Sequence, residues 1–276
     1  MAFTYKRFYT GPVQAVVFDW AGTVVDYGSI APIDGFCMLF ERNGVPITHT
    51  EARGPMGTEK REHISQLLAM PRIRQAWTEL HGSEPTEADI DRLYQEFIPI
   101  QVEAIDKRAG LIPGARETFD YLVERGIKVG GNTGYSQDMI EGLVARAADE
   151  GYRPQSIVAA TDVPRGRPFP HMTLKNLIEL EVENLHACVK VDDTLPGIDE
   201  GLNAGLWTVG IAVSGNEVGM ELADWQALPA AEQDRLREQA SERFRRAGAH
   251  YVIDSVADLP EVIEDIELRL AAGEQP

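Results

Sequence analysis

An aspartate at the end of an apolar run is the first residue whose setting suggests chemistry. The stretch AVVFDWAGTVVD, residues 15–26, leads from an apolar segment through Asp19 into a turn of small residues. A carboxylate presented there could attack phosphorus and form an aspartyl-phosphate. Many enzymes of that kind carry a second aspartate two residues later, which protonates the leaving alcohol, but here that position is Ala21. If Asp19 is a nucleophile, another group must help the leaving group depart.

Three further stretches offer groups that could hold phosphate or a cation. GGNTGYS places Thr133 beside glycines, where a hydroxyl and bare backbone N–H groups can hold phosphate oxygens. GRPFP sets Arg167 between glycine and proline, where its guanidinium could neutralise phosphoryl oxygens. VKVDDTLPG ends an apolar segment in Asp192 and Asp193, which are oxygen ligands of the type that Mg²⁺ prefers. Each stretch alone is also typical of an ordinary turn or helix cap.

Short apolar segments alternate with amphipathic ones along most of the chain, a pattern that predicts βαβ units and a parallel sheet. Ligands of such sheets bind at the carboxyl ends of the strands. We therefore expect an α/β fold in which Asp19, Thr133 and Asp193, each just after a predicted strand, meet at one end. Strands are predicted at 13–18, 128–131, 156–159, 187–191, 207–213 and 251–253, and helices at 115–125, 136–150, 171–180 and 230–246.

The alternation breaks between residues 30 and 107, where the pattern predicts helices and no strand. These helices are expected at 33–43, 56–70, 71–80 and 86–106, the last opened by a capping box of Thr86 and Asp89. An all-helical insertion directly after the first strand indicates a small cap domain over the site, with hinges at Gly28 and 110–114. We divide the chain into an α/β core, residues 1–28 and 108–276, and a helical cap, residues 29–107.

The composition limits the partners that the chain can have. Its 276 residues carry a formal net charge of −18, which repels nucleic acid and anionic membranes. An anionic substrate must therefore meet a local positive pocket. No apolar run approaches the roughly 18 residues of a membrane span, and the N-terminal stretch shows no cleavage signal, so a cytoplasmic location is expected. Cys37 and Cys188 lie in apolar contexts and are expected to be buried free thiols.

Taken in order, the motifs read aspartate, threonine, basic residue and double aspartate. This order resembles the haloacid dehalogenase superfamily of phosphoryl-transfer enzymes, which implies a Rossmann-like core. The stretches FDWAGTVVDYGS, PMGTEKREH, GYS, GRPFP and VDDTLPGIDEGLNAGLWTVG together resemble the phosphonoacetaldehyde hydrolase family, from Val13 to about Leu268. The resemblance implies hydrolysis of the P–C bond of phosphonoacetaldehyde to acetaldehyde and phosphate, in 2-aminoethylphosphonate degradation.

The resemblance assigns the help for the leaving group to Lys60. Met56, Lys60 and His63 have helical spacing and would share one face of the predicted helix 56–70, where a lysine is ordinarily a surface residue. The family's cap lysine forms an imine with the substrate aldehyde, and Lys60 matches it. Attack by Asp19 on phosphorus would then send the P–C electrons into the protonated imine. Burial is expected to depress the pKa of Lys60, so that its amine is partly neutral.

Further roles follow from the same resemblance. Mg²⁺ is expected on the Asp19 carboxylate, the Ala21 main-chain carbonyl and Asp193. An acidic residue often lies four positions after the second aspartate in the superfamily, but here it is Gly197. Asp192 is therefore expected to supply the missing charge, either as a ligand or from just behind one. The implied substrate contacts are Thr133, Gly134, Arg167, Met56, His63 and Tyr135.

Two matters stay open in the sequence. The resemblance implies a homodimer through the caps, but the apolar positions Ile33, Phe36, Cys37 and Phe40 could form that surface or the cap's own core. The alternative function is a haloacid dehalogenase-type phosphatase or phosphomutase acting on a small phosphate ester, against which Ala21 argues. A non-catalytic binding protein of the same fold is disfavoured, because it would not need to keep a nucleophile.

Overall fold

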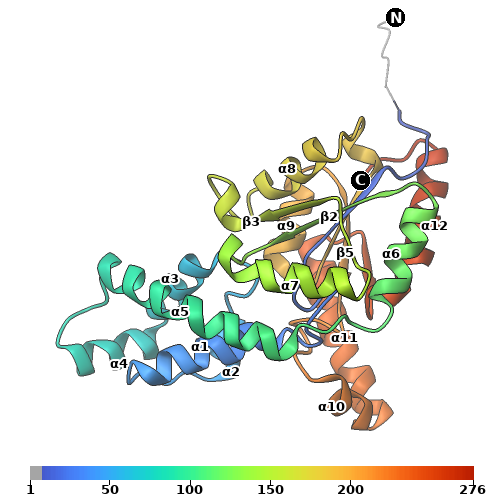
Figure 1. Ribbon diagram of the computed structural model, residues 1–276. Coiled ribbons are helices and arrows are strands. Elements are labelled where there is room, and N and C mark those ends of the chain that lie inside the picture. Colours follow the sequence, from blue (N-terminus) through green and yellow to red (C-terminus); the bar gives the residue numbers. More distant parts are fainter. Residues whose placement is uncertain (1–7) are drawn as a thin grey trace, which may run out of the picture.

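Six strands form one parallel sheet in the computed structural model, which describes residues 8–276 (Figure 1). The first seven residues, part of the stretch in which no cleavage signal is expected, lie outside the described residues. The strand order is β3-β2-β1-β4-β5-β6, so β1 lies between β2 and β4. The strands are β1 (Ala15–Phe18), β2 (Lys128–Thr133), β3 (Ser156–Ala159), β4 (Cys188–Asp192), β5 (Trp207–Ile211) and β6 (Tyr251–Ile253).

The central strands carry apolar side chains on both faces, as buried parallel strands do. Val16 and Phe18 of β1 belong to the large apolar cluster that also holds the inner faces of α6, α7 and α12. Ala15 and Val17 alternate with them and pack on the other face against Leu177 of α8. Helices thus cover both faces of the sheet. They are α6 (Ala115–Glu124), α7 (Gln137–Asp149), α8 (His171–Glu179), α9 (Leu195–Asn203), α10 (Leu222–Ala227), α11 (Ala230–Ala247) and α12 (Leu259–Ala271), with short 3₁₀ turns η1 (Ala160–Asp162), η2 (Leu185–Ala187) and η3 (Val256–Asp258).

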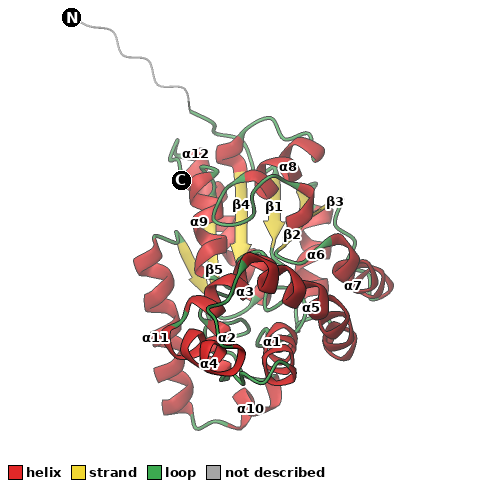
Figure 2. Cartoon of the chain, turned by 90° about the vertical axis from the view of Figure 1, so that its left-hand side faces the viewer, coloured by secondary structure: helices red, strands yellow, loops and turns green. Residues whose placement is uncertain are grey.

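The predicted α/β fold with a helical insertion after the first strand is confirmed. Between β1 and α6 the chain forms only helices, apart from isolated bridges that join Val25 to Ala21 and to Leu111. Figure 2 shows these helices lying beyond the tips of β1 and β4. The division at residues 28/29 and 107/108 stays a prediction. The inserted helices, here called the cap, are α1 (Ile30–Arg42), α2 (His49–Arg53), α3 (Lys60–Ala69), α4 (Pro71–His81) and α5 (Glu87–Arg108).

Several element ends differ from those that the sequence predicts. The predicted helix 56–70 begins only at Lys60, so Met56 lies in the turn that precedes it and does not share a helix face with Lys60. Thr133 is the last residue of β2 instead of following it. The five-residue helix α2 is absent from the predictions, although Thr48 and Glu51 form a complete capping box at its start. The predicted box of Thr86 and Asp89 at α5 is present.

The apolar positions of α1 form the cap's own core. Ile33, Phe36 and Phe40 are fully buried within the chain, and the ring of Phe36 stacks on Phe97 of α5 at 4.4 Å between centroids. These three side chains are therefore not an exposed dimer surface, and the homodimer stays a prediction. Both cysteines are free thiols as expected, but only Cys188 is buried, whereas Cys37 is half-buried and departs from the prediction. Within residues 8–276, the helices include none with the length and apolarity needed to cross a membrane.

We expect Phe36→Ala to destabilise the cap by about 3–5 kcal/mol, because the substitution removes a fully buried ring from between two helices. Urea unfolding followed by the fluorescence of Trp77, which is buried in the cap, measures the effect. Leu80→Ala, at a position 55% exposed on α4, is the control and should stay within about 0.5 kcal/mol of the wild type. Equal stability of the two variants would contradict the assignment of α1 to the cap core.

Candidate active site

Asp19 follows β1 directly and lies at the carboxyl end of the sheet beside Arg167. Its backbone N–H donates to the carbonyl of Val191 in β4, and this bond fixes the backbone from which the carboxylate side chain extends. The guanidinium Nη2 of Arg167 lies 2.6 Å from Asp19 Oδ1, and both side chains are buried. The sequence-predicted nucleophile and the sequence-predicted cation are therefore brought into direct contact.

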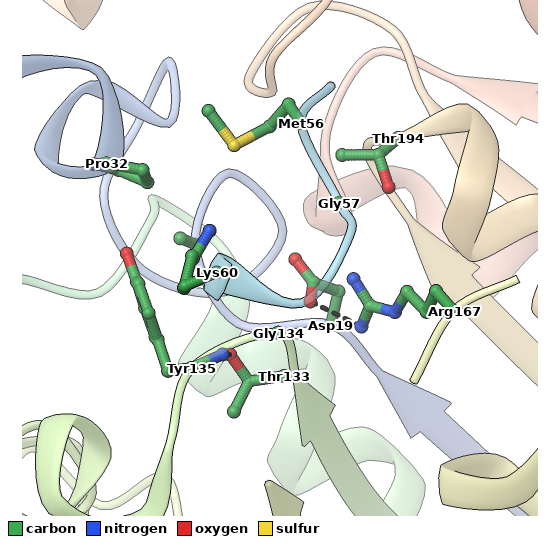
Figure 3. Close-up of a pocket in the computed structure, with 11 residues that line it drawn as sticks. Asp19, Pro32, Met56, Gly57, Lys60, Thr133, Gly134, Tyr135, Arg167 and Thr194 are labelled. Carbon is green, nitrogen blue, oxygen red and sulfur yellow. Dashed lines mark hydrogen bonds and ion pairs between the residues drawn. The ribbon is translucent and has the colours of Figure 1, made fainter. Parts of the chain in front are cut away.

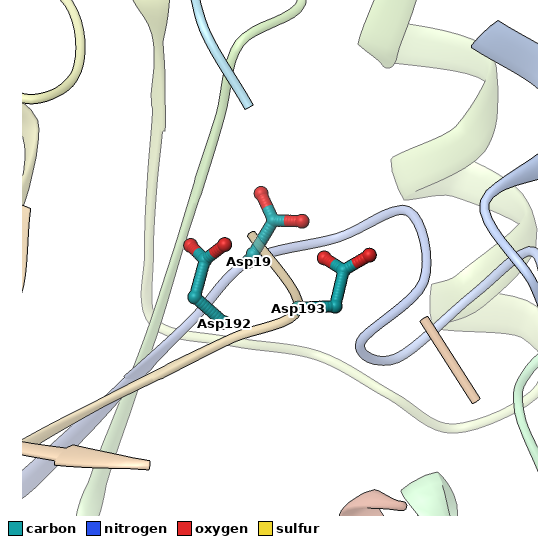
Figure 4. A group of neighbouring side chains, drawn as sticks. All are labelled: Asp19, Asp192 and Asp193. Carbon is teal, nitrogen blue, oxygen red and sulfur yellow. The ribbon is translucent and has the colours of Figure 1, made fainter. Parts of the chain in front are cut away.

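Asp192 and Asp193 complete a cluster of buried carboxylates with Asp19 (Figure 4). One oxygen from each of the three lies within 4.8 Å of the others, an arrangement that could hold a metal ion. Burial raises the pKa of Asp193 well above its usual value, and repulsion from Asp19 and Asp192 adds to this rise. The cluster therefore has negative charge that the surrounding protein does not fully compensate.

The two adjacent aspartates have different partners. Asp193 accepts hydrogen bonds from the Thr23 hydroxyl at 3.2 Å and from the Asn216 backbone N–H at 2.8 Å. Asp192 instead lies 2.9 Å from the ammonium of Lys190 and 3.3 Å from Arg167. Burial alone would raise the pKa of Asp192, but these two cations outweigh it and hold the pKa below its usual value. Asp192 is thus paired with two cations, whereas the hydrogen bonds to Asp193 come from neutral donors.

Two glycines make room for these carboxylates. A Cβ added at Gly22, where φ is +87°, would lie 2.1 Å from Asp193 Oδ2. A Cβ at Gly197 would lie 1.9 Å from Asp192 Cγ, so no side chain fits there. This explains the departure from the superfamily pattern: the space that an acid at position 197 would need is taken by the Asp192 carboxylate.

Lys60 reaches the same region from the cap. It is the first residue of α3, a position at which the positive end of the helix dipole opposes protonation of an amine. Its Nζ lies 4.9 Å from the ring centroid of Tyr135 and 5.7 Å from that of Phe36. Burial lowers the pKa of Lys60 to about 8, although the nearby Asp19 carboxylate partly opposes this change. The amine is therefore partly neutral near neutral pH, as the sequence analysis expects.

The cap and the core approach closely around Lys60 (Figure 3). A Cβ at Gly57, where φ is +92°, would lie 2.3 Å from Thr194 Oγ1, and one at Gly134 would lie 2.7 Å from the carbonyl oxygen of Thr58. Glycine at both positions allows the two surfaces to enclose a pocket. The pocket is lined by Asp19, Ala21, Pro32, Met56, Gly57, Lys60, Thr133, Gly134, Tyr135, Arg167 and Thr194.

Most of the residues that the sequence singles out meet at this pocket, although their roles stay predictions. Asp192 and Asp193 belong to the carboxylate cluster and do not line the pocket. His63 lies behind the pocket wall, where its ring stacks on Phe36 at 3.9 Å between centroids and its Nε2 donates to the carbonyl of Ala52. Burial lowers the pKa of His63 well below its usual value, and the Lys60 charge adds to this. Pro32, Gly57 and Thr194 line the pocket but were not singled out by the sequence analysis.

Sequence reasoning also missed two buried charged residues of this region, Glu200 and Lys190. Glu200 of α9 is fully buried and accepts from the Arg167 Nε at 3.1 Å. Lys190, a charged residue inside the apolar strand β4, is fully buried and donates to Asn132 Oδ1 at 2.8 Å. A glutamate in a helix and a lysine in a strand give no signal by spacing alone. Their buried charge is visible only in the structure.

The chain is similar in sequence to known hydrolases. A family model for haloacid dehalogenase-like hydrolases matches residues 13–205. A phosphonoacetaldehyde hydrolase from Hahella chejuensis is 59% identical over 276 residues, which are 100% of this chain and 94% of the relative. The chain belongs to the phosphonoacetaldehyde hydrolase family. A member from Paraburkholderia phytofirmans is 50% identical over 96% of this chain and 99% of its own.

Solved structures agree with this membership. A phosphonoacetaldehyde hydrolase-like protein from Oleispira antarctica matches with a TM-score of 0.99 and 54% identity, covering 100% of both chains. A β-phosphoglucomutase from Clostridium difficile matches with a TM-score of 0.67 at 18% identity, over 94% of this chain and 99% of its own. The second likeness shows a shared fold alone. As a member of the phosphonoacetaldehyde hydrolase family, the chain is an enzyme of the hydrolase class.

We expect Gly197→Ala to displace the Asp192 carboxylate, because the added methyl group overlaps it and Lys190 holds it from the other side. If the cluster holds Mg²⁺ as the sequence predicts, the affinity for Mg²⁺, measured by calorimetric titration, should fall by about 10–100-fold, as when other partners of metal ligands are lost. The control is Gly142→Ala in α7, where an added Cβ meets nothing within 4 Å. Wild-type affinity in both variants would show that Asp192 does not support a cation site.

Proposed function

We propose that the chain hydrolyses the P–C bond of phosphonoacetaldehyde to acetaldehyde and phosphate, as a step in 2-aminoethylphosphonate degradation. The observation that carries the proposal is a buried cap lysine of lowered pKa facing the Asp19–Arg167 pair in one pocket. The names of the relatives from Hahella chejuensis and Paraburkholderia phytofirmans support the same substrate. We further propose that residues 29–107 form the cap that brings Lys60 to the core.

Lys60 begins the reaction by attacking the aldehyde carbon. The neutral amine adds to the carbonyl, loses water and forms an imine, which is protonated to an iminium. A P–C bond leaves its electron pair on carbon, and an oxygen acid two residues after Asp19 would not stabilise that carbanion. The iminium does, because it accepts the pair and becomes a neutral enamine. The methyl side chain of Ala21 is consistent with a reaction in which no alkoxide leaves.

Asp19 performs the phosphoryl transfer. A carboxylate oxygen of Asp19 bonds to phosphorus as the P–C bond breaks, which gives an aspartyl-phosphate and the enamine. Arg167 is held by Glu200 on one side and contacts Asp19 on the other, so its positive charge lies between the nucleophile and the incoming phosphonate. Thr133 and Gly134 at the end of β2 face the same pocket and are proposed to contact phosphonate oxygens.

Two hydrolyses complete the turnover. The enamine is protonated on carbon, and water cleaves the resulting imine to release acetaldehyde and regenerate the Lys60 amine. A second water attacks the aspartyl-phosphate, which releases phosphate and restores the Asp19 carboxylate. We propose that Met56 and Tyr135 enclose the aldehyde end, since both line the pocket beside Lys60.

The carboxylate cluster fits Mg²⁺. Asp19, Asp192 and Glu200 form ion pairs with Arg167 or Lys190, whereas buried Asp193 forms none with either cation, so a divalent ion would offset the charge that Asp193 adds to the cluster. We propose that Asp19, Asp193 and the Ala21 main-chain carbonyl hold the ion, with Asp192 behind them. When bound, Mg²⁺ supplies charge neutralisation that lets the carboxylate and the phosphonate approach each other.

A phosphatase or phosphomutase acting on a small phosphate ester is the alternative, and the shared fold of the β-phosphoglucomutase keeps it in view. Ala21 disfavours it, because no acid lies two residues after Asp19 to protonate an alkoxide. Phosphate release from phosphonoacetaldehyde and from p-nitrophenyl phosphate separates the two. Release from the ester alone would overturn the proposed function.

Borohydride should trap Lys60 when acetaldehyde is present. Reduction of the imine gives a stable secondary amine, so the enzyme should lose its activity and peptide mass mapping should place the adduct on Lys60. Lys60→Arg keeps the positive charge but cannot form the imine, because guanidinium stays protonated, and it should be nearly inactive. Absence of an adduct together with substantial activity of Lys60→Arg would reduce Lys60 to an electrostatic role. Lys107→Arg, at an exposed cap lysine, is the matched control and should behave as the wild type does.

The pH dependence of kcat/KM should follow the Lys60 amine. Its pKa is lowered to about 8, so the neutral form gains population as pH rises through that value and is lost as pH falls below it. We expect kcat/KM to fall about tenfold for each unit of pH below the pKa, the slope of a single essential deprotonated group. Steady-state rates from about pH 6 to about pH 9 measure it. A flat profile across that range would contradict imine formation by a lysine of lowered pKa.

A further inference from the structure

Arg53, the last residue of α2, joins the cap to the core beside the active site. Its guanidinium donates from Nη1 to the carbonyl of Gly28 at 3.0 Å and to Asn216 Oδ1 at 3.2 Å. Its Nη2 donates to the carbonyl of Gly219 at 2.9 Å. One side chain thus bonds a cap helix to two core segments that lie far apart in the sequence.

The core is shaped to receive this guanidinium. Gly219 has a φ of +64°, and a Cβ added there would lie 2.5 Å from the Arg53 Cζ. The N–H of Gly28 donates to the carbonyl of Ser214. Gly28 also lies tightly against the same loop, since an added Cβ would lie 2.2 Å from the carbonyl oxygen of Met220. Gly28, which the sequence analysis predicts to be a hinge, is therefore tied to the 214–220 loop in this conformation.

The same loop, residues 214–220, also contacts the carboxylate cluster through Asn216. Asn216 accepts from Arg53 with its side chain and donates its backbone N–H to Asp193 Oδ2 at 2.8 Å. A chain of two hydrogen bonds therefore runs from the cap to Asp193. Movement of Arg53 away from the core would remove a constraint on the residue that orients this carboxylate.

On the cap side, Arg53 leads directly to Lys60. The turn after Arg53 carries Met56 and Gly57 into the pocket wall and ends where α3 begins. The carbonyl of Ala52, the residue before Arg53, accepts from His63 of α3 at 2.9 Å, which ties α2 to the helix that presents Lys60. Placing Arg53 on the core therefore also places the start of α3.

We propose that Arg53 is a positioning residue that couples the seating of the cap to the alignment of Asp193. Through the turn that follows it, Arg53 sets Lys60 over the pocket, and through Asn216 it fixes the carboxylate that faces the cation. The contact of Arg53 with the core would thus position both Lys60 and the carboxylate of Asp193. The part that concerns Lys60 rests on the proposed reaction, and the part that concerns Asp193 rests only on the proposed cation site.

The test compares Arg53→Met and Arg53→Lys with Arg72→Met, a matched control. Arg72 is a cap arginine too, but it is exposed and bonds within the cap, to Glu51 and the carbonyl of Pro46. Calorimetric titration with Mg²⁺ should show an affinity about tenfold weaker for Arg53→Met, the lower end of the loss when a partner behind a metal ligand is removed. Arg72→Met should bind Mg²⁺ as the wild type does.

Two further measurements separate positioning from simple stabilisation. The rate of borohydride trapping by acetaldehyde should fall in Arg53→Met while circular dichroism keeps the wild-type spectrum. Arg53→Lys should recover part of the Mg²⁺ affinity, because an ammonium can reach some of the carbonyls but cannot span both segments as a planar fork does. If Arg53→Met fails to fold, Arg53→Lys carries the test, and wild-type Mg²⁺ affinity in that variant overturns the proposal.

The coupling through Asn216 predicts a non-additive pair. Asn216→Ala removes the acceptor of Arg53 but keeps the backbone N–H to Asp193, so the double variant should lose no more Mg²⁺ affinity than Arg53→Met alone. Fully additive losses would overturn the link between cap and carboxylate. Wild-type enzyme that releases no phosphate from phosphonoacetaldehyde would refute the proposed function, whereas the Mg²⁺ affinities would still decide the role of Arg53.

Discussion

The balance of buried charge at the carboxyl ends of β1 and β4 is the constraint on which the rest of the structure depends. Asp192 and Glu200 are fully buried, and each would be costly to ionise without Arg167 and Lys190 beside it. Asp19 then lines the pocket, and Asp193 is the carboxylate that we propose to face a cation. The parallel sheet makes the arrangement possible, because β1 and β4 are neighbours and present their ends side by side.

Close approach at glycine is the second requirement. Gly22 and Gly197 leave room for carboxylates, whereas Gly57 and Gly134 let the cap lie against the core. At none of the four would an added Cβ find an ordinary van der Waals separation, since each would come within 2.7 Å of a neighbouring atom. The absence of side chains at these glycines is therefore as important to the site as its charged groups, and Asp19, Lys60 and Arg167 are all buried there.

The parts of this site that could be predicted are those with a local pattern. Asp19, Arg167 and Asp193 lie in short stretches after apolar runs, and the helical insertion is visible because strand patterns are missing from it. Met56 lines the pocket, but the spacing places it wrongly in a helix, because the turn before α3 depends on contacts with the core that spacing does not reveal. Lys190 and Arg53 were not predicted at all. One is hidden in an apolar strand, and the other bonds mainly to backbone carbonyls, which any sequence possesses.

The burial of Lys60 also bears on which aldehydes the protein reacts with. An amine in water is almost wholly ammonium at neutral pH, so lysines on the surface are poor nucleophiles toward any aldehyde that collides with them. The reactivity that we propose for Lys60 comes from its burial beside the aromatic rings of Phe36 and Tyr135, which lowers its pKa to about 8. The reactivity of the Lys60 amine then depends on its enclosure in the pocket. An aldehyde too large to enter the pocket would therefore not reach the neutral amine, and the proposed catalytic lysine would be protected from adventitious modification.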